Sequence, residues 1–354
     1  MNNLFQRFSS LTRSYYGISI NAHDLFDSAY TKDRCFDFIN DHYIKGEKKK
    51  VFSIPHQYMC EYQENGKHEH TVSLFLLGLL MEDRFSTTIK NKMSSLIGGD
   101  LHEWYDFKYT WYLTCLYHDV ISVIESNENY VNRIPSALNC KLYKENASLF
   151  RFSADTIEKY LQYRKKNGKN EHGIIAGIEI FDNLKTSFET NTKEHNWSVN
   201  PICRKGSLEW RQTHIPHFAY IADAVCCHNI WLAPAHNSTL KGEYQDNNLN
   251  SLIVNSETDR LYFSNFPLQF ALCILDTIEP VKRFRHLTPF EILRNIDIVT
   301  TESGIKIIWT ERIKEQPEFF IWAESIRTLS DWMGVTVSTC KCEDRWCSLT
   351  ISFC

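Results

Sequence analysis

The sequence predicts a mainly helical protein, a helical bundle that is followed by a small C-terminal α+β segment. The chain has 354 residues, of which 43% are hydrophobic and 14% aromatic, enough to bury a large core. Strongly apolar segments of helical length recur up to residue 280, whereas shorter segments rich in β-branched and aromatic residues follow residue 289. We therefore expect three parts: a mostly helical N-terminal extension at 1–66, a helical metal-binding domain at 67–288 and a small α+β domain at 289–354.

The individual elements follow from local patterns along the chain. Residues 22–44 have a helical pattern, and the basic run KGEKKK after them predicts a solvated loop. The apolar helices of the bundle are expected at residues 70–81, 109–124, 172–184, 217–232 and 267–280. In the C-terminal part, the turn signal ESG between two strand-like runs predicts a β-hairpin within residues 295–312, and residues 317–332 predict a helix.

Composition excludes several classes of protein. With 39 lysines and arginines and 43 aspartates and glutamates, the formal charge is 39 − 43 = −4. The chain therefore lacks the excess of basic residues that would indicate binding to nucleic acid or to an anionic membrane. The longest apolar run, LFLLGLLM, is far shorter than the roughly 20 residues of a membrane span, and the N-terminus lacks a secretory pattern. We therefore expect a soluble, cytoplasmic protein without a membrane partner.

The 12 cysteines are irregularly spaced, and several lie inside apolar helical patterns, as Cys226 and Cys227 do. Reduced thiols fit this distribution better than a disulfide framework. A second cluster lies at the C-terminus and lacks the paired C-x-x-C spacing of common zinc sites, so thiols packed between strands are the expected reading: Cys340, Cys342, Cys347 and Cys354.

Each of the five apolar helices carries an ionisable side chain on the face that should be buried. His70, for example, shares a face with Leu74 and Leu77. Taken singly, such a histidine is more often a core residue that is hydrogen-bonded to the backbone. Taken together they favour a shared metal centre, because burying uncompensated polar groups costs several kcal/mol and because imidazoles and carboxylates are ligands of zinc, iron and manganese. The candidate ligands are His70, His118, Asp119, His172, His228 and Asp276.

The order His, His-Asp, His, His, Asp resembles the HD-domain superfamily of metal-dependent phosphohydrolases. The resemblance is carried by EHTVSLFLLGLLM, LYHDV, NEHGIIAGIEIF, ADAVCCHN and LCILDTIEP, and it spans about residues 67–285. It implies that one metal is held by His70, His118, Asp119 and Asp276. It also implies that His172 and His228 hold a second metal, with Asp119 as a catalytic bridge. The implied cofactors are one or two divalent transition metals, Fe, Mn, Zn, Ni or Co, with Mg as a further option.

This chemistry suits hydrolysis of a phosphoester or phosphoanhydride. Two cations about 3.5 to 4 Å apart can hold a metal-bound hydroxide as nucleophile and neutralise the charge of the phosphate oxygens. The expected substrate is therefore a small phosphorylated molecule, in particular a nucleotide or a cyclic nucleotide. Many relatives continue the His-Asp pair with a glycine and a lysine, or with a further histidine. Here the pair continues as HDVISVIESNE, which argues against the subgroup that hydrolyses cyclic di-GMP.

Further polar residues are candidates for substrate contact and proton transfer. Lys169, Lys282 and Arg283, with Arg285 beside them, could bind phosphate, although isolated basic residues are more often simply solvated. His214 and His217 lie one helical turn apart, and either could be a general acid; a capping or surface pair is the alternative.

Two other functions are compatible with the same residues. Some members of the superfamily use four histidines and two aspartates to hold a di-iron centre that oxidises C–H bonds, so ligand identity does not separate a hydrolase from an oxygenase. A nucleotide sensor that binds without turnover is the third alternative. The sequence leaves a homo-oligomer open.

Overall fold

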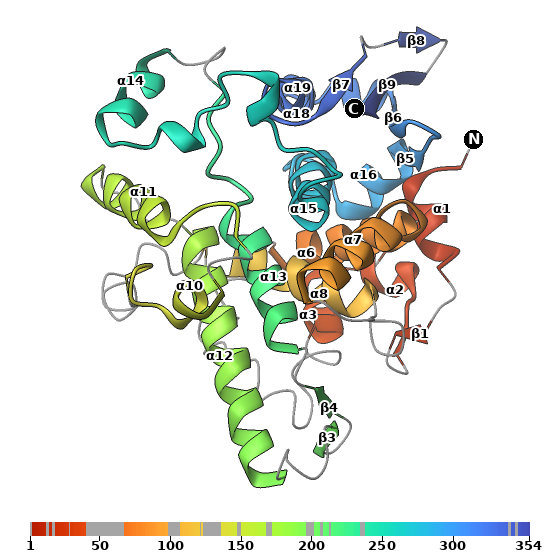
Figure 1. Cartoon of the computed structure of the whole chain (residues 1–354). Helices are drawn as coiled ribbons and strands as arrows, with labels where there is room; N and C mark the ends of the chain where they lie inside the picture. Colours follow the sequence, from red (N-terminus) through yellow and green to blue (C-terminus); the bar gives the residue numbers. More distant parts are fainter. Residues whose placement is uncertain are drawn as a thin grey trace. The chain divides into compact units, whose positions relative to one another are not determined.

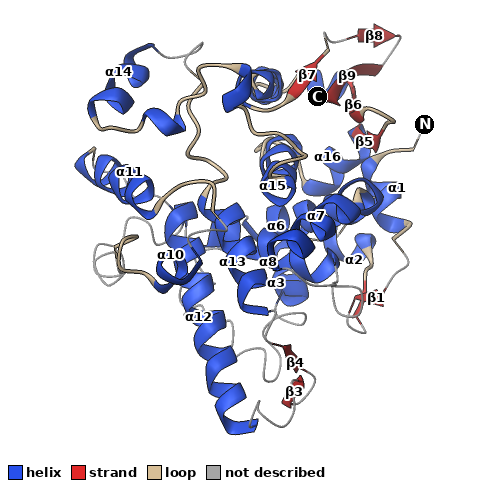
Figure 2. Cartoon of the chain, viewed as in Figure 1, coloured by secondary structure: helices blue, strands red, loops and turns tan. Residues whose placement is uncertain are grey.

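The structure is a computed structural model that is mainly helical, with a small antiparallel sheet near the C-terminus (Figures 1 and 2). The predicted fold class is therefore confirmed. Within the described part of the chain, no helix has both the length and the apolar character that crossing a membrane requires. The structure describes residues 2–11, 14–15, 18–27, 29–39, 67–97, 107–120, 122, 136–146, 150–167, 172–195, 202–205, 208–211, 214–233, 238–338, 341–343 and 346–354.

The chain divides into two compact units, and the first combines the N-terminal helices with the C-terminal third. Unit 1 comprises residues 1–42, 65–89 and 254–354, and unit 2 comprises residues 43–64 and 90–253. The three-part division expected from the sequence stays a prediction. Described helices that lie wholly in unit 1 are α1 (Leu4–Ser9), α2 (Ala22–Phe26), α3 (Thr31–Ile39), α6 (Lys67–Leu80), η6 (Glu257–Asp259), α15 (Pro267–Ile278), α16 (Pro289–Asn295), α17 (Glu311–Lys314), α18 (Phe319–Arg327) and α19 (Leu329–Trp332).

The core of unit 1 contains α6 and α15, and both follow the apolar segments in the sequence. Every residue of α6 from His68 to Leu79 is buried, and α15 is buried from Pro267 to Leu275. Pro267 occupies the first turn of α15, where its missing N–H costs no helical hydrogen bond. α7 (Glu82–Ile97) belongs to unit 1 up to Ile89 and to unit 2 beyond it.

The sheet of unit 1 is antiparallel and has the order β5-β6-β9-β7, with β8 also paired to β9. The predicted hairpin is confirmed, because β5 pairs with β6 and Ile296 lies opposite Trp309. The predicted C-terminal helix is confirmed as α18 and α19. The strands are β5 (Ile296–Thr300), β6 (Gly304–Thr310), β7 (Val335–Val337), β8 (Lys341–Glu343) and β9 (Trp346–Phe353), and a separate short hairpin joins β1 (Ser14–Tyr15) and β2 (Ile18–Ser19).

One cysteine pair differs from the expectation of reduced thiols. Cys342 and Cys347 form a disulfide, with their Cα atoms 4.0 Å apart. The two residues lie directly opposite each other on β8 and β9, and this cross-strand pairing brings the thiols together. Spacing along the sequence does not reveal such a register. Among the described cysteines, the free ones are buried except for the exposed Cys354.

Unit 2 is built around α12, the longest of its described helices, which packs against α13 and α8. The apolar segments predicted at 109–124, 172–184 and 217–232 contribute to these three helices. A short antiparallel hairpin connects α12 with α13. The elements of unit 2 are α8 (Phe107–Val120), α10 (Lys141–Asn146), α11 (Ala154–Lys166), α12 (His172–His195), β3 (Ile202–Lys205), β4 (Leu208–Arg211), α13 (His214–Cys226), α14 (Ser238–Asp246) and η5 (Asn250–Leu252).

Candidate functional site

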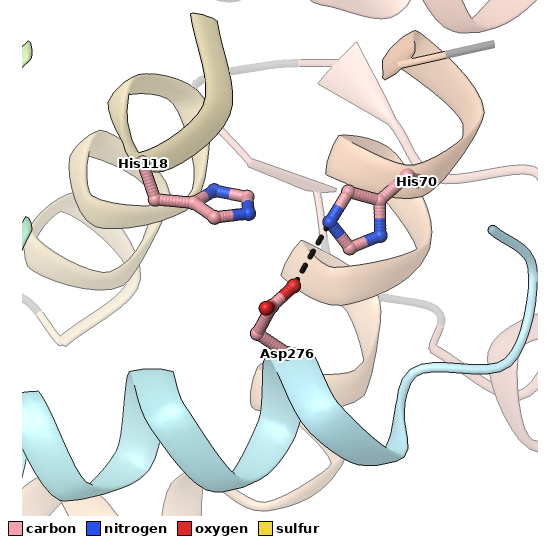
Figure 3. A group of neighbouring side chains, drawn as sticks. All are labelled: His70, His118 and Asp276. Atoms are coloured by element: carbon pink, nitrogen blue, oxygen red, sulfur yellow. Dashed lines mark ion pairs between the residues drawn. The ribbon is translucent and has the colours of Figure 1, made fainter. Parts of the chain in front are cut away.

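Two of the predicted ligands meet in unit 1, where α6 and α15 contribute one residue each. His70 lies in the first turn of α6, and its imidazole is fully buried. Asp276 lies in the last turn of α15, and 19% of its side chain is exposed. Nε2 of His70 is 3.1 Å from Oδ1 of Asp276 (Figure 3). We call His70 and Asp276 the unit 1 pair; His118, also drawn in Figure 3, belongs to unit 2.

Glu279 orients the imidazole of His70. Nδ1 of His70 lies 2.7 Å from Oε2 of Glu279, while the Ser73 hydroxyl and the backbone N–H of Val281 donate to Oε1. Burial alone raises the pKa of Glu279, but the hydrogen bond and charge of His70, followed by the Ser73 and Val281 donors, outweigh it and hold the pKa below its ordinary value. Because an ionised carboxylate can only accept, Nδ1 of His70 is the donor to Glu279, and Nε2 is the ring nitrogen that faces Asp276.

Two of the predicted phosphate-binding residues lie beside the unit 1 pair. The Lys282 ammonium is 3.1 Å from Nε2 of His70 and donates to Oδ1 of Asp276. Arg283 donates instead to the backbone carbonyl oxygens of Asp276 and Thr277, at 2.9 and 3.4 Å, and so caps the end of α15. Lys282 therefore contacts both ligand side chains, whereas the described contacts of Arg283 are those of a helix cap.

Three other predicted ligands come together within unit 2. Asp119 from the end of α8, His172 from the start of α12 and His228 just after α13 place one ligand atom each within 4.8 Å of one another. Asp119 and His228 are buried, and 22% of the His172 side chain is exposed. The two oxygens of Asp119 face different rings: Oδ1 is 3.4 Å from Nε2 of His172, and Oδ2 is 3.7 Å from Nε2 of His118. We call Asp119, His172 and His228 the unit 2 group.

Backbone carbonyl oxygens fix the tautomers of two histidines in unit 2. Nδ1 of His118 lies 2.7 Å from the carbonyl oxygen of Cys115, and Nδ1 of His228 lies 2.7 Å from that of Val225. A carbonyl oxygen can only accept, so each Nδ1 carries a proton and each Nε2 is the ring nitrogen left for a metal. Both rings are thus oriented by backbone oxygens, without a carboxylate partner on Nδ1.

Two glycines on α12 allow α13 to approach closely enough for His172 and His228 to meet. A Cβ atom at Gly173 would lie 2.9 Å from both Cε1 of His228 and the carbonyl oxygen of Val225. A Cβ atom at Gly177 would lie 2.3 Å from Sγ of Cys226 and 2.6 Å from a backbone oxygen of α13. Any larger residue at these positions would push the two helices apart.

The donor sets of both units fit a divalent transition metal. Neutral imidazole nitrogens and carboxylate oxygens are preferred ligands of zinc, iron and manganese. Metal–ligand bonds of about 2.1 Å allow two ligand atoms on one ion to lie at most about 4.2 Å apart, so the 4.8 Å span of the unit 2 group is only slightly wider. These buried histidine and aspartate side chains could therefore hold a metal ion.

The two histidines that were predicted as acid candidates have different surroundings. His217 is buried, and its Nε2 lies 2.9 Å from Oγ1 of Thr110. Burial, with a smaller effect of His214, lowers the pKa of His217 to about 3. His217 is thus neutral at pH 7 and a poor proton donor there, whereas the partly exposed His214 is better placed to exchange protons with solvent. The catalytic role of either residue stays a prediction.

Some residues with predicted roles lie outside the described part of the chain, and others were not predicted. Lys169, a predicted phosphate contact, is outside it. The carboxylate found on Nδ1 of His70, a predicted ligand, is that of Glu279, which the sequence analysis did not identify. Glu279 follows Asp276 by three residues, a spacing that places two helical side chains on one face and could have indicated their association.

Comparisons of the chain with protein-family models, with curated proteins and with solved structures gave no match.

Proposed function

We propose that this protein is a metal-dependent hydrolase of phosphoesters or phosphoanhydrides, with a nucleotide or cyclic nucleotide as substrate. The observation that carries the proposal is the unit 2 group, in which a buried carboxylate from the end of α8 and two histidines, from the start of α12 and just after α13, place ligand atoms within 4.8 Å of one another. A metal at such a site would lower the pKa of a bound water and neutralise the charge of a phosphate.

The two oxygens of Asp119 support its role as a bridge. Each oxygen faces a different imidazole, that of His172 or that of His118. A carboxylate that serves two ions needs this divergence of its oxygens. The order of ligands along the sequence extends the proposal to the unit 1 pair as further metal ligands, and metal stoichiometry per chain tests this extension.

The cationic side chains after α15 favour a phosphorylated substrate over the uncharged C–H bond that an oxygenase would attack. Lys282 and Arg283 lie next to Asp276 in unit 1. An ammonium group close to a metal ligand is suited to bind phosphate oxygens as a point charge. His214 is the candidate for protonating the leaving group, because it opens α13 and is partly exposed.

The test compares the full chain with its Asp119→Ala variant. We expect the purified protein to retain Mn, Fe, Zn, Co or Ni in elemental analysis and to release phosphate or a nucleotide from a panel of nucleotides and cyclic nucleotides. Chelation should abolish this activity, and the metal should restore it. Loss of a residue that only hydrogen-bonds to a metal ligand typically lowers metal affinity by about 10- to 100-fold. Asp119→Ala removes a proposed ligand itself, so it should lower metal affinity by about 100-fold or more.

His286→Gln is the matched control, because His286 is 70% exposed and its described ion pair is with Glu318, away from the proposed ligands. It should leave activity and metal content unchanged. Product release that persists undiminished in metal-free protein would contradict the proposal. Oxygen consumption together with the EPR signal of a mixed-valent iron pair would identify the oxygenase instead. Tight nucleotide binding with bound metal and no product would identify the sensor.

A further inference from the structure

The ammonium group of Lys282 occupies the two atoms that the unit 1 pair would offer to a metal. It lies 3.1 Å from Nε2 of His70 and donates to Oδ1 of Asp276. Since Nδ1 of His70 is engaged with Glu279, Nε2 is the ring nitrogen left for a metal, and it is the one that Lys282 contacts. The lysine and a metal ion would therefore use the same donor atoms.

The backbone holds Lys282 in this place. The N–H groups of Val281 and Lys282 both point to the carboxylate of Glu279, at 2.9 and 3.4 Å, and the N–H of Arg283 donates to the carbonyl oxygen of Pro280. Glu279 thus orients His70 and also fixes the turn that carries the lysine. The contact of Lys282 with His70 and Asp276 therefore depends on a turn whose backbone is held on both sides of Lys282, as well as on the rotamer of the lysine side chain.

The charges are balanced when Lys282 contacts the pair. Two carboxylates, those of Asp276 and Glu279, lie beside two cationic side chains, those of Lys282 and Arg283. A divalent ion at the same atoms would meet an ammonium at about hydrogen-bonding distance, in a region where Lys282 is 22% and Asp276 19% exposed. Like charges this close repel strongly, so binding of the ion requires the ammonium to leave.

We propose that Lys282 is an internal cation that compensates the unit 1 pair and competes with the metal for it, so that this lysine sets the metal affinity of the pair. The inference rests on the proposed role of His70 and Asp276 as metal ligands. It assigns Lys282 a regulatory role that precedes any contact with substrate: a metal binds to this pair only by displacing the lysine.

The test measures metal affinity in the full chain, in a His228→Gln background that weakens the unit 2 group. Mn²⁺ or Co²⁺ is titrated by calorimetry, and the Co²⁺ absorption spectrum reports imidazole ligation. Lys282→Met removes the charge but keeps a long side chain, and we expect it to bind the ion at least about tenfold more tightly, equivalent to about 1.4 kcal/mol. Lys282→Arg keeps the charge and should bind no more tightly than the parent.

Two further variants make the result specific. Adding Asp276→Asn to Lys282→Met should abolish the gain in metal affinity, because the carboxylate for which the lysine and the metal compete is no longer there. Lys314→Met, at a lysine that is 44% exposed and contacts Glu311, should leave the affinity unchanged. Melting curves of the metal-free variants report folding, and Lys282→Gln replaces Lys282→Met if the latter is not folded.

Equal metal affinity of Lys282→Met, Lys282→Gln and the parent, within twofold, would overturn the inference. The proposed function fails separately. Tighter metal binding in Lys282→Met without any hydrolysis by the wild-type chain would refute the hydrolase and retain the role of Lys282. Metal-dependent hydrolysis by the wild-type chain, with metal affinity unchanged in Lys282→Met and Lys282→Gln, would support the hydrolase and refute the role of Lys282.

Discussion

The unit 1 pair and the unit 2 group position similar side chains by different means. In unit 1, the His70 ring is oriented by a carboxylate, and the pair is compensated by the ammonium of Lys282. In unit 2, backbone carbonyl oxygens orient His118 and His228, and the close approach of α12 and α13 sets the distance between the rings. Charge balance stabilises the first arrangement, and rigid helix packing stabilises the second.

This difference predicts how each arrangement will respond to metal and to mutation. A carboxylate hydrogen-bonded to Nδ1 makes an imidazole more basic than a carbonyl oxygen does, so the unit 1 pair would bind a metal more strongly for this reason but, on our proposal, only by releasing Lys282. In the unit 2 group, Nδ1 of His228 donates to a backbone oxygen, which is a weaker hydrogen bond, so metal affinity there would depend more on side chains that are already in position. Mutations of charge should therefore act mainly on the unit 1 pair, and mutations of packing mainly on the unit 2 group.

The largest effect is expected from Gly177→Ala. The added Cβ would lie 2.3 Å from Sγ of Cys226 and 2.6 Å from a backbone oxygen of α13, so the two helices must separate. Overpacking of this kind costs about 1 to 3 kcal/mol or more of unfolding free energy, and the separation of His172 from His228 should weaken metal binding by the unit 2 group. Urea unfolding and metal titration measure the two effects.

Gly242→Ala is the matched control for this variant. Gly242 lies within α14, and a Cβ atom there would have no described atom within 4 Å apart from those of its chain neighbours and of the backbone of its own helix. Alanine is favoured over glycine inside a helix, so this variant should gain up to about 1 kcal/mol. If Gly177→Ala were as stable as Gly242→Ala and bound metal equally well, helix packing would not organise the unit 2 group.

A smaller effect is expected from Glu279→Gln, which removes the carboxylate that is hydrogen-bonded to Nδ1 of His70. The amide keeps the shape of the side chain and loses its charge, so it orients His70 less firmly and makes it a weaker ligand. Outer-shell changes of this kind lower metal affinity by about 10- to 100-fold. Calorimetry in the His228→Gln background measures the change, with the 55% exposed Glu311→Gln as control. An affinity within twofold of the parent would rule out this role of Glu279.

The smallest effect concerns the pH dependence of stability and contrasts one buried carboxylate in each unit. Burial raises the pKa of Asp223 in α13 from 3.8 to about 7. Between these values the native state binds more protons than the unfolded state, so the unfolding free energy falls as pH rises. Glu279 has a lowered pKa, so its contribution is instead lost as pH falls below its ordinary value of 4.5.

The unfolding free energy of the wild type should therefore fall by about 2 kcal/mol between pH 5 and pH 7, and Asp223→Asn should not show this fall. Urea unfolding at the two pH values, for wild type and variant, measures this difference. A wild-type stability that changes with pH in the same way as that of Asp223→Asn would show that Asp223 does not carry the expected proton in the native state.

Much of the fold followed from the sequence because its signals are local. The apolar run that follows His70 indicates a buried helix, and the ESG turn between two β-branched runs indicates the hairpin of β5 and β6. The disulfide between Cys342 and Cys347 could not be foreseen, because it depends on which residues of β8 and β9 lie opposite each other.

The candidate ligands were also readable, whereas their supporting contacts were not. Periodicity indicates that His172 and His228 face a core, but it does not say which helices meet there or how closely. The need for Gly173 and Gly177 depends on the distance between α12 and α13. The contact of Lys282 with His70 joins residues 212 positions apart and depends on the turn held by Glu279.

The central claim, that Asp119, His172 and His228 bind a metal, is tested most directly by anomalous X-ray diffraction from crystals of the Mn²⁺- or Zn²⁺-loaded protein. We predict an anomalous peak at the absorption edge of the metal, about 2.0 to 2.2 Å from a carboxylate oxygen of Asp119 and from one nitrogen of each histidine. Metal-loaded crystals without an anomalous peak at these three side chains would contradict the account.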